Sequence, residues 1–103
     1  MIVVSVTYPA AKGSWFDLDY YRAKHVPLVR ERWGPCGLTD AKFVCGVAAP
    51  GGGPIACHLI ALLSFGSQAE FERAAQQHGK EVMSDIKNFT DVKPAVQINE
   101  IFG

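Results

Sequence analysis

The segment from residue 55 to residue 65, IACHLIALLSF, restricts the possible folds more than any other part of the chain. Its length and its apolar residues, bounded by Pro and Gly, are typical of a β-strand. Side chains on a strand alternate between two faces, and here both faces are largely apolar. Leu59 and Leu63 lie on one face, and Ile60 and Leu62 lie on the other. The strand therefore needs cover on both sides.

Hydrophobic periodicity and turn residues divide the rest of the chain into three more strands and two helices. The first helix begins at a cap residue, Asp17, and the second at a capping box formed by Ser67 and Glu70. The expected strands span residues 2–8, 38–47, 55–65 and 94–102, and the expected helices span residues 18–32 and about 68–83. The order βαββαβ predicts an α+β, ferredoxin-like fold with a four-stranded antiparallel sheet. A chain of 103 residues has room for one such domain, residues 1–103.

Both helices of this topology pack on one face of the sheet, so the other face of the apolar strand is left uncovered. Hydrophobic residues make up 49% of the chain and charged residues only 19%, which is apolar for a protein of this size. A second copy laid over the open face would stabilise it by roughly 25 cal/mol per Å² of apolar area. A lipid-like ligand would shield less area. We therefore predict a homodimer.

Polar side chains of the first and last strands are expected on this open face. If the valines at positions 4 and 6 face the helices, the side chains that project the other way are Ser5, Thr7, Gln97 and Asn99. Uncharged hydrogen-bonding groups among apolar neighbours are typical of a cavity that binds a small, mostly apolar ligand. The same four side chains would equally suit contact with water at a sheet edge.

His25 is the strongest candidate for catalysis, because it lies on the apolar stripe of the first helix beside Pro27. Pro27 lacks an amide hydrogen and is expected to kink the helix, which would free a carbonyl to orient the imidazole. Alternatively, Asp91 or Asn88 could orient the ring. A neutral imidazole in an apolar cavity suits general acid or base catalysis near neutral pH. The structural alternative is a packed histidine that anchors the loop before the last strand.

His58 is the second catalytic candidate. It shares one face of its strand with Ile60 and Leu62, and it could transfer protons if that face lines the cavity. If that face meets the helices, His58 is a packed histidine that needs one hydrogen-bond partner. Tyr21, on the stripe of His25, is a candidate for stacking on a substrate, although aromatic residues in such positions also form cores and interfaces.

Composition and motifs argue against several classes of function. Ten basic and ten acidic residues balance without clustering, so binding to nucleic acid or to an anionic membrane is not expected. The N-terminal apolar run stops at Pro9, which argues against a signal peptide or a membrane span. The three cysteines have no metal-ligand spacing and suggest reduced thiols in a cytoplasmic protein. The glycines at 51–53 join two strands instead of opening a helix, so they are not expected to form a phosphate loop. We expect no metal and no cofactor.

Two motifs, one near each end of the chain, together carry a family resemblance. The first is FDLDYY at residues 16–21, followed by HVPLV at residues 25–29, and the second is MSDIKNFTDVKPAVQI at residues 83–98. The chain resembles the EthD family in these motifs and in its order of elements. The resemblance covers essentially the whole chain. It implies a dimeric α/β-barrel, in which two ferredoxin-like protomers pack sheet to sheet and each keeps a cavity.

The resemblance leaves two classes of function open. The EthD family is named after a protein associated with bacterial degradation of ethyl tert-butyl ether, and similar barrels include monooxygenases, cyclases and isomerases, so the fold does not choose a reaction. The first hypothesis is a cofactor-independent oxidoreductase, isomerase or cyclase that acts on a small apolar, oxygen-bearing molecule in a degradation pathway, with His25 moving a proton. The second is a non-catalytic protein that binds such a molecule or assists a partner oxygenase.

Overall fold

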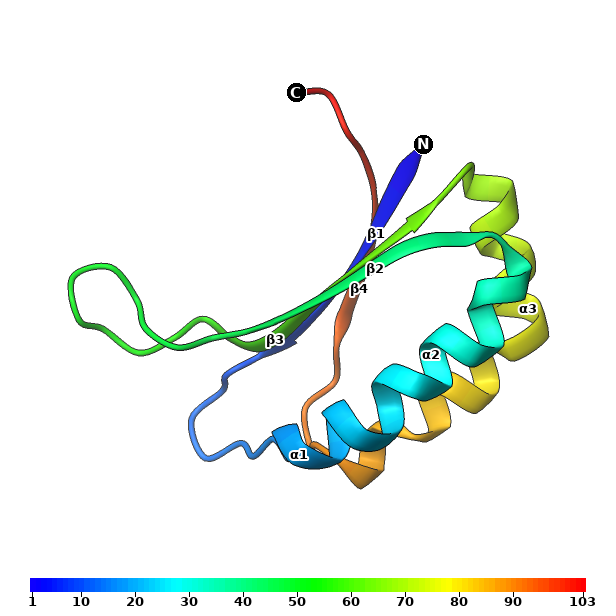
Figure 1. Ribbon diagram of the computed structural model, residues 1–103. Helices are drawn as coiled ribbons and strands as arrows, with labels where there is room; N and C mark the ends of the chain where they lie inside the picture. The colour runs from blue at the N-terminus through cyan, green and yellow to red at the C-terminus, as the bar shows by residue number, and fades with distance from the viewer.

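The computed structural model describes residues 1–103, and its elements follow the order βαββαβ (Figure 1). The strands are β1 Ile2–Pro9, β2 Leu38–Cys45, β3 Cys57–Phe65 and β4 Ala95–Glu100, and the long helix is α3 Gln68–Ser84. The first helical segment consists of α1 Leu18–Tyr20, a π-helical turn η1 Tyr21–His25, α2 Val26–Trp33 and a 3₁₀ turn η2 Gly34–Cys36. A second 3₁₀ turn, η3 Ile86–Asn88, follows α3. The α+β, ferredoxin-like fold predicted from the sequence is confirmed.

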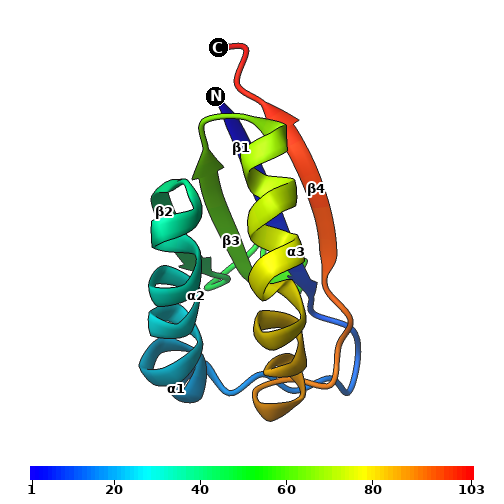
Figure 2. The same cartoon turned by 90° about the vertical axis from the view of Figure 1, so that its right-hand side faces the viewer.

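The strands form one antiparallel sheet in the order β2-β3-β1-β4, and α2 and α3 lie side by side on one face of it (Figure 2). The face of β3 that meets the helices is fully buried, whereas the opposite face is half-buried. The buried set comprises Leu59, Ala61, Leu63 and Phe65, and the half-buried set includes Ile60 and Leu62. β3 therefore carries apolar residues on both faces, as the sequence indicates. Only the face toward the helices is covered within the chain.

The hairpin between β2 and β3 is longer than predicted. β2 ends at Cys45 instead of Val47, and β3 begins at Cys57 instead of Ile55. Gly51 and Gly52 have φ values of 83° and 88°, which turn the tip back. We call residues 46–56 the hairpin arm. It extends well beyond the sheet (Figure 1), and it carries no charged residue.

Local hydrogen bonds fix where the two helical segments begin. The Asp17 carboxylate accepts a hydrogen bond of 3.0 Å from the backbone N–H of Tyr20, and Ser67 Oγ accepts one of 3.2 Å from the N–H of Glu70. The Glu70 carboxylate lies beside Gly37, whose φ of 105° and lack of Cβ permit this close approach. Asp17 and Ser67 therefore cap their helices as predicted, but the return bond of the predicted capping box, from the Ser67 N–H to Glu70, is not made.

Candidate functional site

A π-helical turn brings His25 to the sheet side of the first helical segment. The backbone N–H of Val26 bonds to the carbonyl of Tyr21, five residues back, instead of four residues back as in an α-helix. Pro27 follows directly and has no amide hydrogen to restore the α-helical pattern. The irregularity predicted beside His25 is thus present as a widened turn. His25 is only 3% exposed, and its ring centroid lies 4.7 Å from that of Phe89 and 4.9 Å from that of Tyr21.

Asp85 orients the His25 ring. Nδ1 of His25 lies 2.9 Å from Oδ2 of Asp85, the residue that follows the end of α3. The other carboxylate oxygen of Asp85 accepts hydrogen bonds from the Tyr20 hydroxyl at 2.6 Å and from Nδ2 of Asn88 at 3.0 Å. Direct contact of Asn88 or Asp91 with His25, considered from the sequence, is wrong. Asn88 bonds to Asp85, and Asp91 instead accepts a hydrogen bond from the backbone N–H of Trp15 at 3.0 Å.

The electrostatics of this pair favour one protonation state. Burial lowers the pKa of His25 below its ordinary value, although the hydrogen bond and charge of Asp85 act in the opposite direction. Burial alone would raise the pKa of Asp85, but hydrogen bonds from Tyr20, Asn88 and His25 hold it below its ordinary value. At neutral pH, therefore, a neutral imidazole faces a carboxylate. An ionised carboxylate can only accept, so Nδ1 carries the hydrogen and Nε2 keeps its lone pair.

His25 lines a small apolar cavity between the helices and the sheet, which we call the inner cavity. Its volume is about 30 Å³, room for a water molecule or two. Every enclosed side-chain nitrogen or oxygen atom in the structure has a hydrogen-bond partner, and Nε2 of His25 makes no such bond. Nε2 is therefore not sealed off, and we infer that it borders this cavity. The other lining residues are Val6, Tyr8, Tyr21, Val29, Trp33, Phe43, Ala61, Leu63, Val82, Met83 and Ile86.

A larger depression adjoins the inner cavity, and we call it the outer pocket. It has a volume of about 200 Å³ and is lined by residues of α1, α2, β2 and β3, of which Arg22 is the one charged residue. Tyr21 and Phe43 line both spaces. The Arg30 guanidinium lies 5.6 Å from the centre of the Phe43 ring. Movement of the Tyr21 and Phe43 side chains would connect the outer pocket with His25.

The predicted substrate-binding side chains fall into two groups on opposite faces of the sheet. Tyr21 lies with His25 on the helix side. Ser5, Gln97 and Asn99 come together on the open face, where Nδ2 of Asn99 donates to Ser5 Oγ at 3.0 Å and Nε2 of Gln97 donates to Oδ1 of Asn99 at 2.5 Å. Thr7 Oγ1 donates to the Ala95 carbonyl at 3.3 Å. The structure therefore does not bring these four polar side chains to His25.

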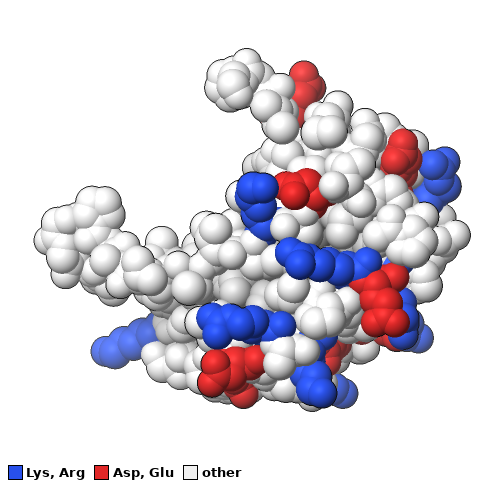
Figure 3. Space-filling model, viewed as in Figure 1, with Lys and Arg blue, Asp and Glu red and all other residues white.

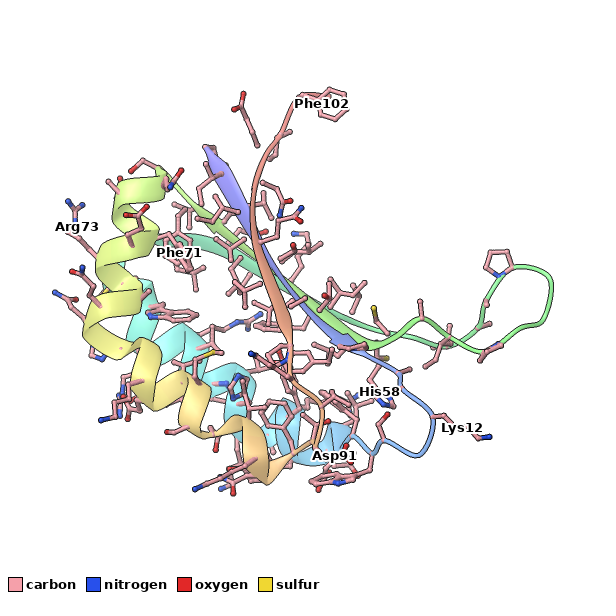
Figure 4. All side chains as sticks on the ribbon, turned by 180° about the vertical axis from the view of Figure 1, so that it is seen from behind. Lys12, His58, Phe71, Arg73, Asp91 and Phe102 are labelled. Atoms are coloured by element: carbon pink, nitrogen blue, oxygen red, sulfur yellow. The ribbon has the colours of Figure 1, made fainter.

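His58 lies at the end of the sheet, beside the loop that carries Lys12 (Figure 4). It is the extra residue of a β-bulge, because Tyr8 pairs with Leu59 and Pro9 pairs with Cys57. Its Nε2 lies 2.8 Å from Ser14 Oγ, and its ring stacks on Phe16 with the centroids 5.6 Å apart. His58 does not line the inner cavity. A proton-transfer role for it remains a prediction, and the observed contacts hold the loop between β1 and α1.

The sequence analysis missed two residues of the site, Tyr8 and Asp85. Tyr8 could have been placed on the helix side by extending the alternation of Val4 and Val6. Asp85 had no such signal, since contact with His25 depends on how the end of α3 lies against η1. No three His, Cys, Asp or Glu side chains converge in a metal-binding arrangement. None of the helices has the length and apolar character that crossing a membrane requires.

The fold and the cavity between helices and sheet define the class of protein: ferredoxin-like α+β domains that pack two helices on an antiparallel sheet. No family model and no curated protein matches the chain. Among solved structures, an EthD-like protein from Ralstonia eutropha JMP134 is 34% identical over 99% of this chain and 92% of its own, with a TM-score of 0.91. The chain therefore belongs to the EthD-like family.

More distant structures share the fold. An ethyl tert-butyl ether degradation (EthD) family protein from Bacillus halodurans C-125 is 20% identical over 99% of both chains, with a TM-score of 0.71. A DABB family protein with a ferredoxin-like fold from Mesorhizobium loti MAFF303099 is 17% identical over 99% of this chain and 97% of its own, with a TM-score of 0.63. At these identities the similarity concerns the fold alone.

Proposed function

We propose that the chain is a cofactor-independent enzyme that moves a proton on a small, mostly apolar, oxygen-bearing molecule, with His25 as the base. The observation that carries this proposal is the buried His25–Asp85 pair beside the inner cavity. Degradation of a small oxygenated compound is the setting that the family name suggests.

The geometry of the pair suits a general base. Asp85 accepts from Nδ1 at 2.9 Å, which fixes both the ring orientation and the tautomer. The lowered pKa of His25 keeps the imidazole neutral near pH 7, so that Nε2 is ready to accept a proton. Tyr20 and Asn88 complete the hydrogen bonds of the carboxylate, which leaves it little freedom to turn away.

The substrate would enter from the outer pocket. That space accommodates a small molecule and is lined mostly by apolar side chains, whereas the inner cavity is too small for one. Met83, which is 46% exposed, and Phe43 border the inner cavity and could move to enlarge it. The bound molecule would then place its reacting atom near Nε2 of His25.

Replacement of His25 tests the proposal. Small ketones, lactones and phenols would be offered in D₂O, and deuterium incorporation and product formation would be followed by NMR. His25→Gln is expected to lower turnover of any processed compound by roughly 10²- to 10⁴-fold, the usual contribution of a general base. His78→Gln is the matched control, because His78 lies half-buried beside Glu81, outside both spaces. Equal rates in wild type and His25→Gln would exclude proton transfer by His25.

The second candidate function is non-catalytic binding of the same kind of molecule, or support of a partner oxygenase. The small volume of the inner cavity favours it, because the buried histidine could then be a packed residue held by Asp85. Binding without any turnover in the same NMR experiment, with affinity unchanged in His25→Gln, would support this function over the first.

We also propose that two copies pair through the open face of the sheet. The hairpin arm and the C-terminal tail, residues 101–103, project on this side and leave the surface hollowed between them (Figure 3). The arm carries no charged side chain, whereas charged groups lie over the helices and also beside the hollow in this view. On the open face, β2 carries the ion pair of Lys42 and Asp40, and β3 carries half-buried Ile60 and Leu62. A second sheet would cover these apolar groups.

A further inference from the structure

Two buried tyrosines of the inner cavity have no part in the proton transfer proposed above. Tyr8 is on β1 and Tyr21 is in the π-helical turn, and each is 2% exposed. Their rings meet edge to face with centroids 6.0 Å apart. Both line the inner cavity together with His25. The hydroxyl groups act on each other through a side-chain hydrogen bond, which contributes to the pKa of both, and neither is an enclosed group without a partner.

These hydroxyls are nearly all the polar chemistry that the cavity offers. No charged side chain lines it. The indole N–H of Trp33 is already committed, because it donates to the Ala74 carbonyl at 2.9 Å. What remains is the lone pair on Nε2 of His25 and the pair of tyrosine hydroxyl groups, which act on each other through a hydrogen bond. One acceptor and one hydroxyl pair, whose second proton is free to donate, therefore line the same apolar space.

The tyrosine hydroxyls can act only as donors or weak acceptors in this setting. Burial raises the pKa of both Tyr8 and Tyr21 well above the ordinary value, and the charge of Asp85 raises that of Tyr8 further. Each hydroxyl also influences the pKa of the other, which places them close together. Both therefore keep their protons at neutral pH. A negative charge that develops on a ligand oxygen beside them would be stabilised by hydrogen bonds in a dry site.

We infer that the site takes an uncharged carbon acid, a small ketone or 1,3-dicarbonyl compound, and that the Tyr8 and Tyr21 hydroxyls bind its carbonyl oxygen. This inference rests on the proposed role of His25 and names its substrate class. A carboxylate or phosphate beside His25 would have no cation to balance its charge, because Arg22 lines only the outer pocket. A hydrocarbon could enter, but it would leave the free proton of the hydroxyl pair without an acceptor.

The reaction balances without an oxidant or a reductant. His25 Nε2 takes the proton from the carbon next to the carbonyl, and the C–H bond breaks. The electron pair of that bond forms a carbon–carbon double bond, while the carbonyl π electrons move onto oxygen to give an enolate. The tyrosine hydroxyls stabilise this oxyanion. If the imidazolium exchanges its proton with D₂O before it reprotonates the same carbon, deuterium is incorporated; if it delivers its proton to a conjugated carbon, an isomer forms.

Deuterium exchange provides the test. 2-Indanone is the probe, because it is small, uncharged and has acidic C–H groups next to a carbonyl, and indane is the hydrocarbon control of similar size. We expect the wild type to bind 2-indanone more tightly than indane and to catalyse its exchange in D₂O. The double variant Tyr8→Phe/Tyr21→Phe keeps both rings and their packing. It should lose roughly 10²- to 10³-fold in exchange rate, while its affinity for indane stays unchanged.

A spectroscopic measurement checks the contact itself. The carbonyl stretching frequency of bound 2-indanone should be lowered in the wild type by hydrogen bonding and should shift back in the double variant. The measurements distinguish failure of the His25 proposal from failure of the tyrosine proposal. Loss of exchange in His25→Gln, with undiminished exchange and an unshifted carbonyl band in the double variant, would overturn the tyrosine site and leave the His25 role intact. Unchanged exchange in His25→Gln would overturn the base. A wild type that neither prefers 2-indanone nor exchanges it would exclude the carbon-acid class.

Discussion

The two faces of the sheet carry polar side chains in different surroundings. On the helix side, His25 is enclosed by aromatic rings, its pKa is lowered, and one acidic residue fixes its orientation. On the open face, Gln97 is exposed and Asn99 is half-buried; the Gln97 amide bonds to that of Asn99, and the Asn99 amide bonds to Ser5. A buried polar group needs a specific partner, whereas an exposed one can exchange partners with water. We therefore expect catalysis or ligand binding on the helix side of the sheet and pairing of two copies on the open face.

The largest expected effect is a difference in the free energy of unfolding between variants of two neighbouring residues of β3. Leu63 meets the helices and is 2% exposed, whereas Leu62 lies on the open face. Leu63→Ala should lower the free energy of unfolding by about 2–5 kcal/mol at any protein concentration, because it leaves a buried cavity. Leu62→Ala should cost less in dilute protein, and its cost should increase with concentration if the face pairs. Urea unfolding at two protein concentrations measures both, and equal costs would remove the distinction between the faces.

The next effect concerns the acid behind His25. Asp85→Asn should lower a His25-dependent activity by roughly 10²- to 10⁴-fold, because a neutral amide no longer fixes the tautomer that leaves Nε2 free. Asn88→Ala removes only one hydrogen bond to Asp85 and should cost about tenfold or less. Initial rates over pH 5 to 8 measure both variants. Equal activity in Asp85→Asn and wild type would show that the pair is structural.

The open face can be tested by adding a charge. Ile60→Asp should convert a dimer into a monomer at micromolar concentration, because a carboxylate would be buried among apolar side chains. Ala69→Asp, on the exposed side of α3, is the matched control and should leave assembly unchanged. Light scattering gives the mass. A monomeric wild type under the same conditions would refute pairing altogether.

The lowered pKa of His25 predicts a pH dependence of stability. Between this lowered value and the ordinary value of 6.5, the unfolded chain binds a proton that the folded chain does not. The stabilisation from neutral His25 is therefore complete above pH 6.5 and is lost as pH falls through the lowered pKa. The slope should not exceed about 1.4 kcal/mol per pH unit. Urea unfolding from pH 7 to pH 5 should show a shallower decline for His25→Gln than for wild type, and parallel curves would contradict the assignment.

The smallest effect concerns His58. Ser14→Ala removes the contact between Oγ and Nε2 of His58 and should lower the free energy of unfolding by about 1 kcal/mol. It should not change a His25-dependent activity, because His58 lies outside the inner cavity. Thermal unfolding and the exchange assay together measure this. Loss of activity without loss of stability would restore His58 to the catalytic candidates.

The sequence predicts the fold well, because each element is specified locally. Asp17 and Ser67 cap helices, the side chains of β3 are apolar on both faces, and both features follow from spacing. The site is harder to predict, because its parts meet through tertiary packing. His25 and Tyr21 stand out by periodicity, but Asp85 reaches His25 across sixty positions of sequence. Side-chain alternation places Ser5 and its neighbours correctly on one face, yet it cannot show that His25 lies on the other.

The widened turn at Tyr21–His25 has a consequence for variation among homologues. A π-helical turn corresponds to an α-helix with one residue inserted, and such insertions rotate everything on one side of them by about 100°. Deleting a residue between Asp17 and His25 would therefore turn Tyr20 away from Asp85, or turn His25 away from the sheet. The number of residues between the cap and the histidine should thus be kept unchanged in relatives that retain the pair. This spacing offers a criterion for finding them that is independent of overall identity.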